Sequence, residues 1–210
     1  VSPLWKLGRY LQLGQEGELT RHVMVVRDGV ERMLEATVKC DETHLLHHLR
    51  LVSGDAELRD MVINLLVAGR DTTSVTLTSC IRCLALYPEC QKAIYSELQY
   101  YLFTRGGRVG WDALMRDCSY LRCFLREVHR LYPPVHTDLK MVTTRDLLPS
   151  GIEVFPGESV VYSIWSMGRD KELWGTDVNE FKPERWRLKD GFDPYRYPIF
   201  NAGYRTCLGQ

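Results

Sequence analysis

A single cysteine in a glycine-flanked loop, Cys207, constrains what this chain can fold into more than any other feature of its sequence. Arg205 and Phe200 lie two and seven residues upstream of it, and Gly203 and Gly209 lie on either side. The glycines let the backbone approach a flat group closely, and Arg205 can donate paired hydrogen bonds to a carboxylate. Phe200 can shield a thiolate sulfur. The pattern predicts a loop that offers a thiolate to a haem iron, with Arg205 on a haem propionate.

These residues fit Phe-x-x-Gly-x-Arg-x-Cys-x-Gly at every fixed position. The chain thereby resembles the cytochrome P450 family of haem-thiolate monooxygenases. The resemblance implies haem b with Cys207 as axial ligand, and electrons from NADPH through a separate flavin-containing reductase. It also places Lys140 where the family commonly has an arginine that reaches a propionate; lysine keeps the charge and loses the planar fork. Tyr204 stands where many relatives have proline. Taken alone, the motif also fits a buried structural cysteine in a glycine turn.

A second motif, residues 68–73, lies inside a long run of helical periodicity. A glycine within a helix costs about 1 kcal/mol relative to alanine, so it calls for a compensating role. Thr72 can offer its hydroxyl to the carbonyl of Ala68, and Asp71 beside it completes an acid–alcohol pair that can deliver protons. The motif matches the oxygen-binding helix of the P450 family, which assigns Asp71 and Thr72 to catalysis. The alternative is an exposed Arg70–Asp71 edge with threonines that face a neighbouring element.

A third motif, Glu127-x-x-Arg130, places opposite charges on one helix face. An exposed pair of this kind contributes about 0–1 kcal/mol. Followed by two prolines, it matches the Glu-x-x-Arg helix of the P450 family, and residues 181–186 supply a second arginine, Arg185. The resemblance implies a buried structural triad of Glu127, Arg130 and Arg185 that holds the cysteine loop against the helical core. Removing one partner from such a group costs about 3–5 kcal/mol.

The periodicity predicts a mostly α chain with a small β portion, which the resemblance identifies as the C-terminal part of the P450 fold, incomplete at both ends. A helix is expected over 16–40, with apolar residues at helical spacing from Val23 and Val26 through Val30 to Val38. Short strands are expected at 140–144, 152–155 and 159–162. We interpret residues 1–210 as one partial domain: helices over 1–54, the oxygen-binding helix over 55–86, further helices over 87–132, β elements and an irregular stretch over 133–199, and the haem-ligand loop over 200–210.

Composition excludes some classes of protein. The 210 residues carry 27 Lys and Arg against 27 Asp and Glu, and this zero balance argues against a nucleic-acid surface. The longest apolar run, 61–68, is too short to span a bilayer. The chain begins at Val1 and stops three residues after Cys207. We therefore expect a piece of a longer protein whose membrane anchor precedes Val1.

Two clusters of metal-binding residue types also occur. Cys80-x-x-Cys83 lies within a helical run without a second pair at zinc spacing, so we interpret both thiols as core residues. His44, His47 and His48 lack a thiol or carboxylate to complete a metal site, and we interpret them as a solvated patch. The seven cysteines show no disulfide framework.

Several stretches resemble long-chain fatty-acid and alkane terminal hydroxylases, among them 68–74 and 162–168. The resemblance implies insertion of one atom of dioxygen into a C–H bond of a lipophilic substrate, by fatty-acid hydroxylation, in a protein associated with the endoplasmic reticulum membrane. His136 and Asp138 would line the substrate pocket, face away from it or bind a polar end group of the substrate. Two alternatives stay open. One is an enzyme of the same fold that rearranges peroxides, against which Asp71 and Thr72 argue; the other is a non-functional or haem-poor fragment.

Overall fold

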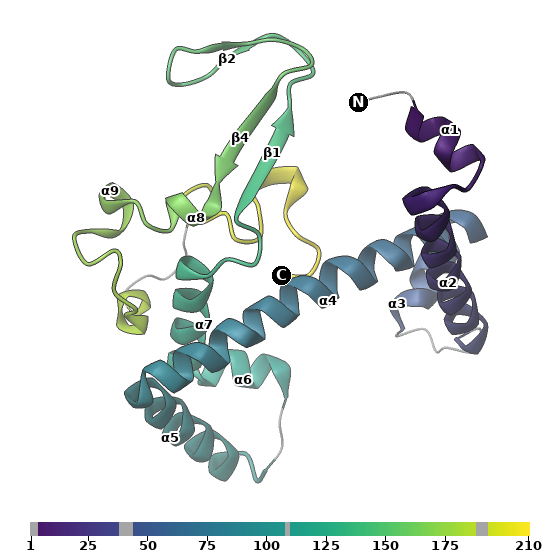
Figure 1. Cartoon of the computed structure of the whole chain (residues 1–210). Helices are drawn as coiled ribbons and strands as arrows, with labels where there is room; N and C mark the ends of the chain where they lie inside the picture. The colour runs from purple at the N-terminus through teal and green to yellow at the C-terminus, as the bar shows by residue number, and fades with distance from the viewer. Residues whose placement is uncertain (1–3, 38–43, 108–109, 188–192) are drawn as a thin grey trace. The chain divides into compact units, whose positions relative to one another are not determined.

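The computed structural model describes residues 4–37, 44–107, 110–187 and 193–210. It divides into two compact units, Val1–Arg70 and Asp71–Gln210, and Figure 1 labels their α-helices. One long helix, α4 (Asp55–Leu86), begins in the first unit and ends in the second. Asp55 and Glu57 stand in its first turn, where negative charge is favoured by the helix dipole. The sequence predicted this helix over 55–86, and the structure has it there.

The first unit is helical. It contains α1 (Leu4–Tyr10), α2 (Gly14–Ala36), α3 (Leu45–Val52) and the beginning of α4. Its core consists of Val30 from α2, Leu46 from α3, and Leu58 and Val62 from α4, all buried. His44 is the N-cap of α3, and its Nδ1 accepts the backbone N–H of Leu46 at 3.3 Å. His44 therefore has a structural role that the predicted solvated patch did not include.

The helix expected over 16–40 differs from α2 in two ways. α2 ends at Ala36, and Thr37 is its C-cap, where the backbone leaves the helical conformation with φ −100° and ψ 11°. Val38 lies outside the described residues. Of the predicted apolar face, Val30 is buried, whereas Val23 and Val26 are 41% and 49% exposed. Helical spacing thus identified the face, but only its C-terminal part packs within this unit.

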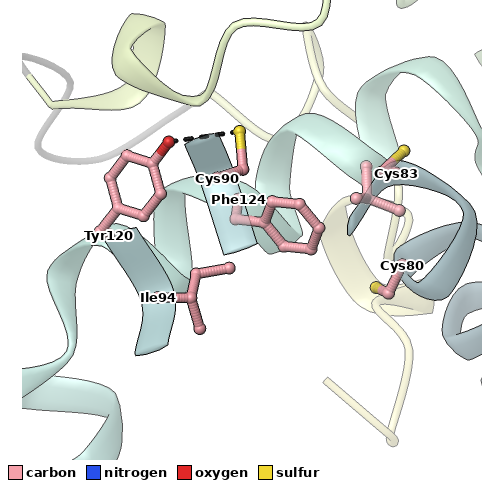
Figure 2. Packing of buried hydrophobic residues seen from close by; sticks show 7 residues of the cluster. Cys80, Cys83, Cys90, Ile94, Tyr120 and Phe124 are labelled. Atoms are coloured by element: carbon pink, nitrogen blue, oxygen red, sulfur yellow. Dashed lines mark hydrogen bonds between the residues drawn. The ribbon is translucent and has the colours of Figure 1, made fainter. Parts of the chain in front are cut away.

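The second unit is built around α7 (Ser119–Leu131), which packs against α5 (Pro88–Thr104) and α6 (Trp111–Asp117). Pro88 begins α5 at a position where its missing N–H costs nothing. The core joins α4, α5 and α7, and Figure 2 shows the Tyr120 hydroxyl directed at the Cys90 sulfur, 3.4 Å away. Cys80 and Cys83 lie in the same core, as predicted. Among the described cysteines none forms a disulfide.

After α7 the chain forms two small antiparallel sheets. β1 (Thr137–Met141) pairs with β4 (Ser159–Ser163), and β2 (Asp146–Leu147) pairs with β3 (Glu153–Val154). The second and third predicted strands correspond to β3 and β4. The first was placed three residues too late, and β2 was not predicted, because two exposed residues carry no alternation.

The last segments are irregular and short. They comprise α8 (Ile164–Met167), α9 (Lys171–Trp174), η1 (Pro183–Trp186) and η2 (Gly203–Arg205). Trp174, Val178 and Trp186 are buried together with Cys123 of α7, so this stretch has its own apolar cluster against that helix. The mostly helical fold with a small β portion is confirmed. Within the described ranges, no helix is both long and apolar enough to cross a membrane.

Candidate functional site

Cys207 differs from the other described cysteines in exposure. It is exposed, whereas the remaining five are buried. Burial raises the pKa of each buried thiol, that of Cys83 to about 11. A thiol with a raised pKa is a poor source of the thiolate that binds a metal. Cys40 lies outside the described residues. Among the thiols that the structure describes, Cys207 is therefore the one suited to ligate a metal from solvent-accessible space.

The backbone around Cys207 forms a closed loop. The Cys207 N–H donates to the Phe200 carbonyl at 2.7 Å. Inside the loop, Asn201 and Gly203 have left-handed φ angles of 65° and 68°, a conformation that favours glycine and that asparagine tolerates better than most residues. Beyond it, the Gly209 N–H lies 3.3 Å from the Cys207 Sγ. An N–H directed at sulfur stabilises negative charge on it.

Two residues of the predicted haem contact are not explained by packing. A Cβ at Gly209 would meet only the Cys207 sulfur, at an ordinary 3.8 Å. Arg205 lies exposed in η2. No contact in the described chain requires a glycine at position 209. The Arg205 guanidinium faces solvent. Their assignment to haem stays a prediction.

Phe200 contacts α7 directly and is linked to α4 through His129. Its half-buried ring meets His129 of α7 edge-on, with centroids 5.7 Å apart. The His129 Nε2 in turn lies 3.3 Å from the Thr76 hydroxyl on α4. Burial lowers the pKa of His129, so the ring is neutral at pH 7 and can share one hydrogen with Thr76. Neither His129 nor Thr76 was singled out from the sequence, because a lone histidine on a helix face is indistinguishable from a core residue.

Glu127 and Arg130 of α7 form a fully buried ion pair. The Arg130 Nε and Nη2 donate to the two carboxylate oxygens at 2.8 and 2.6 Å. The remaining guanidinium hydrogens go to the carbonyls of Gly168, Val178 and Glu180, at 2.7, 2.7 and 3.0 Å. Each of the five N–H donors of an arginine thus has an acceptor. Such complete pairing is what allows a charge to stay away from water.

Arg185 joins this pair. Its Nε lies 3.2 Å from Glu127 Oε1, and the carboxylate also accepts the Lys182 backbone N–H and the Trp186 indole, each at 2.9 Å. The Arg185 Nη1 donates to Asp177 at 2.9 Å. Hydrogen bonds from Arg185 and Lys182 lower the pKa of Asp177 to about 2. Asp177 is a fourth charged member of the group, and no spacing in the sequence distinguishes it from its acidic neighbours.

Gly168 is a second residue that the sequence motifs did not identify. Its carbonyl accepts a hydrogen bond from Arg130, and a Cβ on it would stand 2.2 Å from the Arg130 carbonyl oxygen. A Cβ and a non-bonded atom essentially never approach so closely, and the atom in the way belongs to the backbone, which cannot easily move. Only glycine fits between α8 and the end of α7.

Asp71 and Thr72 lie near the middle of α4, Asp71 exposed and Thr72 half-buried. The helix is continuous through Gly69, where a Cβ would meet no atom within 4 Å. This glycine is therefore not required by packing in the described chain. The assignment of Asp71 and Thr72 to proton delivery stays a prediction.

Lys140 lies on β1 and is 47% exposed. Its ammonium is 3.2 Å from the Asp138 carboxylate, a partner that the sequence analysis did not foresee. Its predicted contact with a haem propionate stays a prediction.

A protein-family model described as Cytochrome P450 matches residues 26–210. Cytochrome P450 94A2 of Vicia sativa is 35% identical over 231 residues, covering all of this chain and 44% of the relative. Cytochrome P450 94C1 of Arabidopsis thaliana is 34% identical, covering 99% of this chain and 44% of the relative. Cytochrome P450 86B1 of Arabidopsis thaliana is 34% identical, covering 99% and 42%. The chain spans less than half the length of these relatives.

Proposed function

Because this chain belongs to the cytochrome P450 family, we propose that its protein is a haem-dependent monooxygenase that inserts one atom of dioxygen into a C–H bond of a lipophilic substrate. The observation that supports this most strongly is the exposed Cys207 thiol with the Gly209 N–H against its sulfur. The other described thiols are buried, and burial raises the pKa of each.

The donor set around Cys207 fits a haem. One sulfur is available to bind the iron, and the Gly209 N–H would keep it negatively charged. Arg205 and Lys140 are exposed cations that would hold the two propionates. When bound, haem supplies the activation of dioxygen, which no side chain can perform. The chain's own part in proton delivery would be the Thr72 hydroxyl, which would hold a proton, and the Asp71 carboxyl, which would replace it from solvent.

We further propose a long-chain fatty acid as substrate, a flavin-containing reductase that passes electrons from NADPH, and an association with the endoplasmic reticulum membrane. The support is the resemblance of 68–74 and 162–168 to fatty-acid hydroxylases. The complete protein with reductase, NADPH and a long-chain fatty acid should yield a hydroxylated acid. Conversion of a fatty-acid hydroperoxide without any reductant would favour the peroxide-rearranging alternative instead.

The ligand assignment is tested by Cys207→Ala in the complete protein. Only a thiolate donates enough charge to iron to give the red-shifted spectrum of the reduced carbon monoxide complex, so the variant should lose that spectrum. Cys80→Ala removes a buried thiol from the same chain and should keep it. Persistence of the thiolate spectrum in Cys207→Ala would refute the assignment.

A further inference from the structure

Asp138 connects three segments of the second unit through one carboxylate. It lies on β1 directly opposite Tyr162 of β4. Its Oδ2 accepts the Tyr162 hydroxyl at 2.7 Å, the Asn201 side-chain amide at 3.0 Å and the Lys140 ammonium at 3.2 Å. Its Oδ1 accepts the Leu139 N–H at 2.7 Å. Both oxygens are therefore occupied by the protein itself, which leaves Asp138 poorly suited to bind a polar end of a substrate.

Asn201 is the point at which this carboxylate reaches the cysteine loop. It immediately follows Phe200, whose carbonyl accepts the Cys207 N–H, and its φ of 65° is left-handed. Its Oδ1 accepts the Ala202 N–H at 2.9 Å while its amide nitrogen donates to Asp138. The side chain is thus held at both ends. The direction in which the loop leaves Phe200 depends on that conformation.

Tyr162 donates to the same carboxylate. Its oxygen lies 2.7 Å from Asp138 and 3.2 Å from the Asn201 Oδ1. A phenol has one proton, and the shorter, charge-assisted bond to the carboxylate takes it. Asp138 therefore orients both Tyr162 and the Asn201 amide, and neither of these can replace it, because it alone brings a negative charge.

The charge states at neutral pH suit this arrangement. The hydrogen bond from Tyr162 lowers the pKa of Asp138, and burial together with Asp138 raises the pKa of Tyr162. Asp138 is consequently ionised and Tyr162 protonated at pH 7. Because the folded pKa of the carboxyl is depressed, the contribution of these bonds is present above its usual value, near 4, and is lost only in acid.

We propose that Asp138, Tyr162 and Asn201 form a latch that positions the cysteine loop, with Asp138 as its central positioning residue. The latch lies between the β1–β4 ribbon and the C-terminal segment, drawn in yellow in Figure 1. Its bonds join residues of this chain only. Its consequence for iron ligation rests on the proposed role of Cys207.

The first test uses the complete protein and measures amide hydrogen exchange. Asp138→Ala should accelerate exchange of the Ala202 and Cys207 amides about tenfold or more, the scale expected when hydrogen bonds to a charged group are lost. Asp146→Ala is the matched control. The Asp146 Oδ1 accepts the next N–H in its strand at 2.8 Å, as that of Asp138 does, and it lies exposed on β2. If the Ala202 and Cys207 amides exchange at the same rate in Asp138→Ala as in Asp146→Ala, the latch proposal is wrong.

The second test uses the haem-loaded protein and its reduced carbon monoxide spectrum. Asp138→Ala and Tyr162→Phe should each convert part of the thiolate-ligated form to the form without thiolate, and Asp146→Ala should not. Tyr162→Phe leaves the Asp138–Lys140 pair intact, so its effect reports the loop rather than the released lysine.

The outcomes separate the two proposals. A parent protein without a thiolate spectrum would refute the ligand role of Cys207. The exchange experiment would still test whether Asp138 holds the cysteine loop. A parent with the spectrum, together with Asp138 and Tyr162 variants that keep it in full, would refute the positioning role even if exchange had accelerated.

Discussion

Two parts of the second unit differ in how completely the chain supplies their contacts: the buried group of Glu127, Arg130, Arg185 and Asp177, here called the Glu127 group, and the Cys207 loop. Glu127 and Arg130 are wholly buried, and every guanidinium hydrogen of Arg130 has an acceptor. Cys207 and Arg205 are exposed, and no contact explains the glycine at 209. In the Glu127 group, the chain itself supplies a partner for each buried charge, which a purely structural group requires. The Cys207 loop leaves its cysteine and its arginine exposed in the described chain, and their binding to haem stays a proposal.

The largest effect is expected from Glu127→Ala. It would leave Arg130 buried without its counter-ion and remove the acceptor of Arg185, the Lys182 N–H and the Trp186 indole, at a cost of about 3–5 kcal/mol. Denaturant unfolding should show this loss, and the complete protein should accumulate little haem-loaded material. Glu180→Ala is the control, since Glu180 contributes only its carbonyl. Normal stability and haem loading in Glu127→Ala would mean that the buried group is dispensable.

Gly168→Ala should destabilise the same group by displacing the backbone beside Arg130. The added methyl would stand 2.2 Å from the Arg130 carbonyl oxygen, so the chain must shift, and overpacking of this kind costs about 1–3 kcal/mol. Gly29→Ala in α2, where a Cβ meets nothing within 4 Å, should be neutral or slightly stabilising. Thermal unfolding of the two variants measures the difference. Similar melting temperatures would show that the α7–α8 contact can relax.

Acid should weaken the ion pair between Asp177 and Arg185. The folded pKa of Asp177 is lowered to about 2 by Arg185 and Lys182, whereas an unfolded aspartate titrates near 4. Its contribution is therefore full above about pH 4 and is lost as pH falls toward 2. Asp177→Asn should lose less stability over that interval than the parent. Parallel stability curves for the two proteins between pH 5 and pH 2 would exclude Asp177 from the acid response.

Thr72→Ala should leave stability within about 0.5 kcal/mol of the parent, because the residue is half-buried on a continuous helix. In the complete enzyme it should raise the share of NADPH that ends as peroxide rather than hydroxylated product, since proton delivery would be disordered. Thr78→Ala, whose hydroxyl bonds only the preceding turn at Ser74, is the control. Equal coupling in both variants would remove Thr72 from the proposed relay.

Local signals predicted most of the helices and fewer of the strands. The prolines at 133 and 134 predicted the end of α7, which closes at Leu131, because proline blocks a helix regardless of its surroundings. The first strand was misplaced, since its extent is decided by pairing with β4, in which Asp138 stands opposite Tyr162. Spacing alone placed Val23 and Val26 on the apolar face of a helix, but burial depends on what packs against α2, and both side chains are exposed.

The sequence by itself determined the ligand candidate Cys207 and the pair of Glu127 and Arg130, because both depend on residue type and on spacings within one loop or one helical turn. Only the tertiary structure decided that Asp177 and Gly168 complete the buried group and that Asp138 reaches Asn201. These contacts join residues 8 to 63 positions apart. Hydrogen-bond acceptors are too common in any sequence for such distant partners to be chosen before folding brings them within 3 Å.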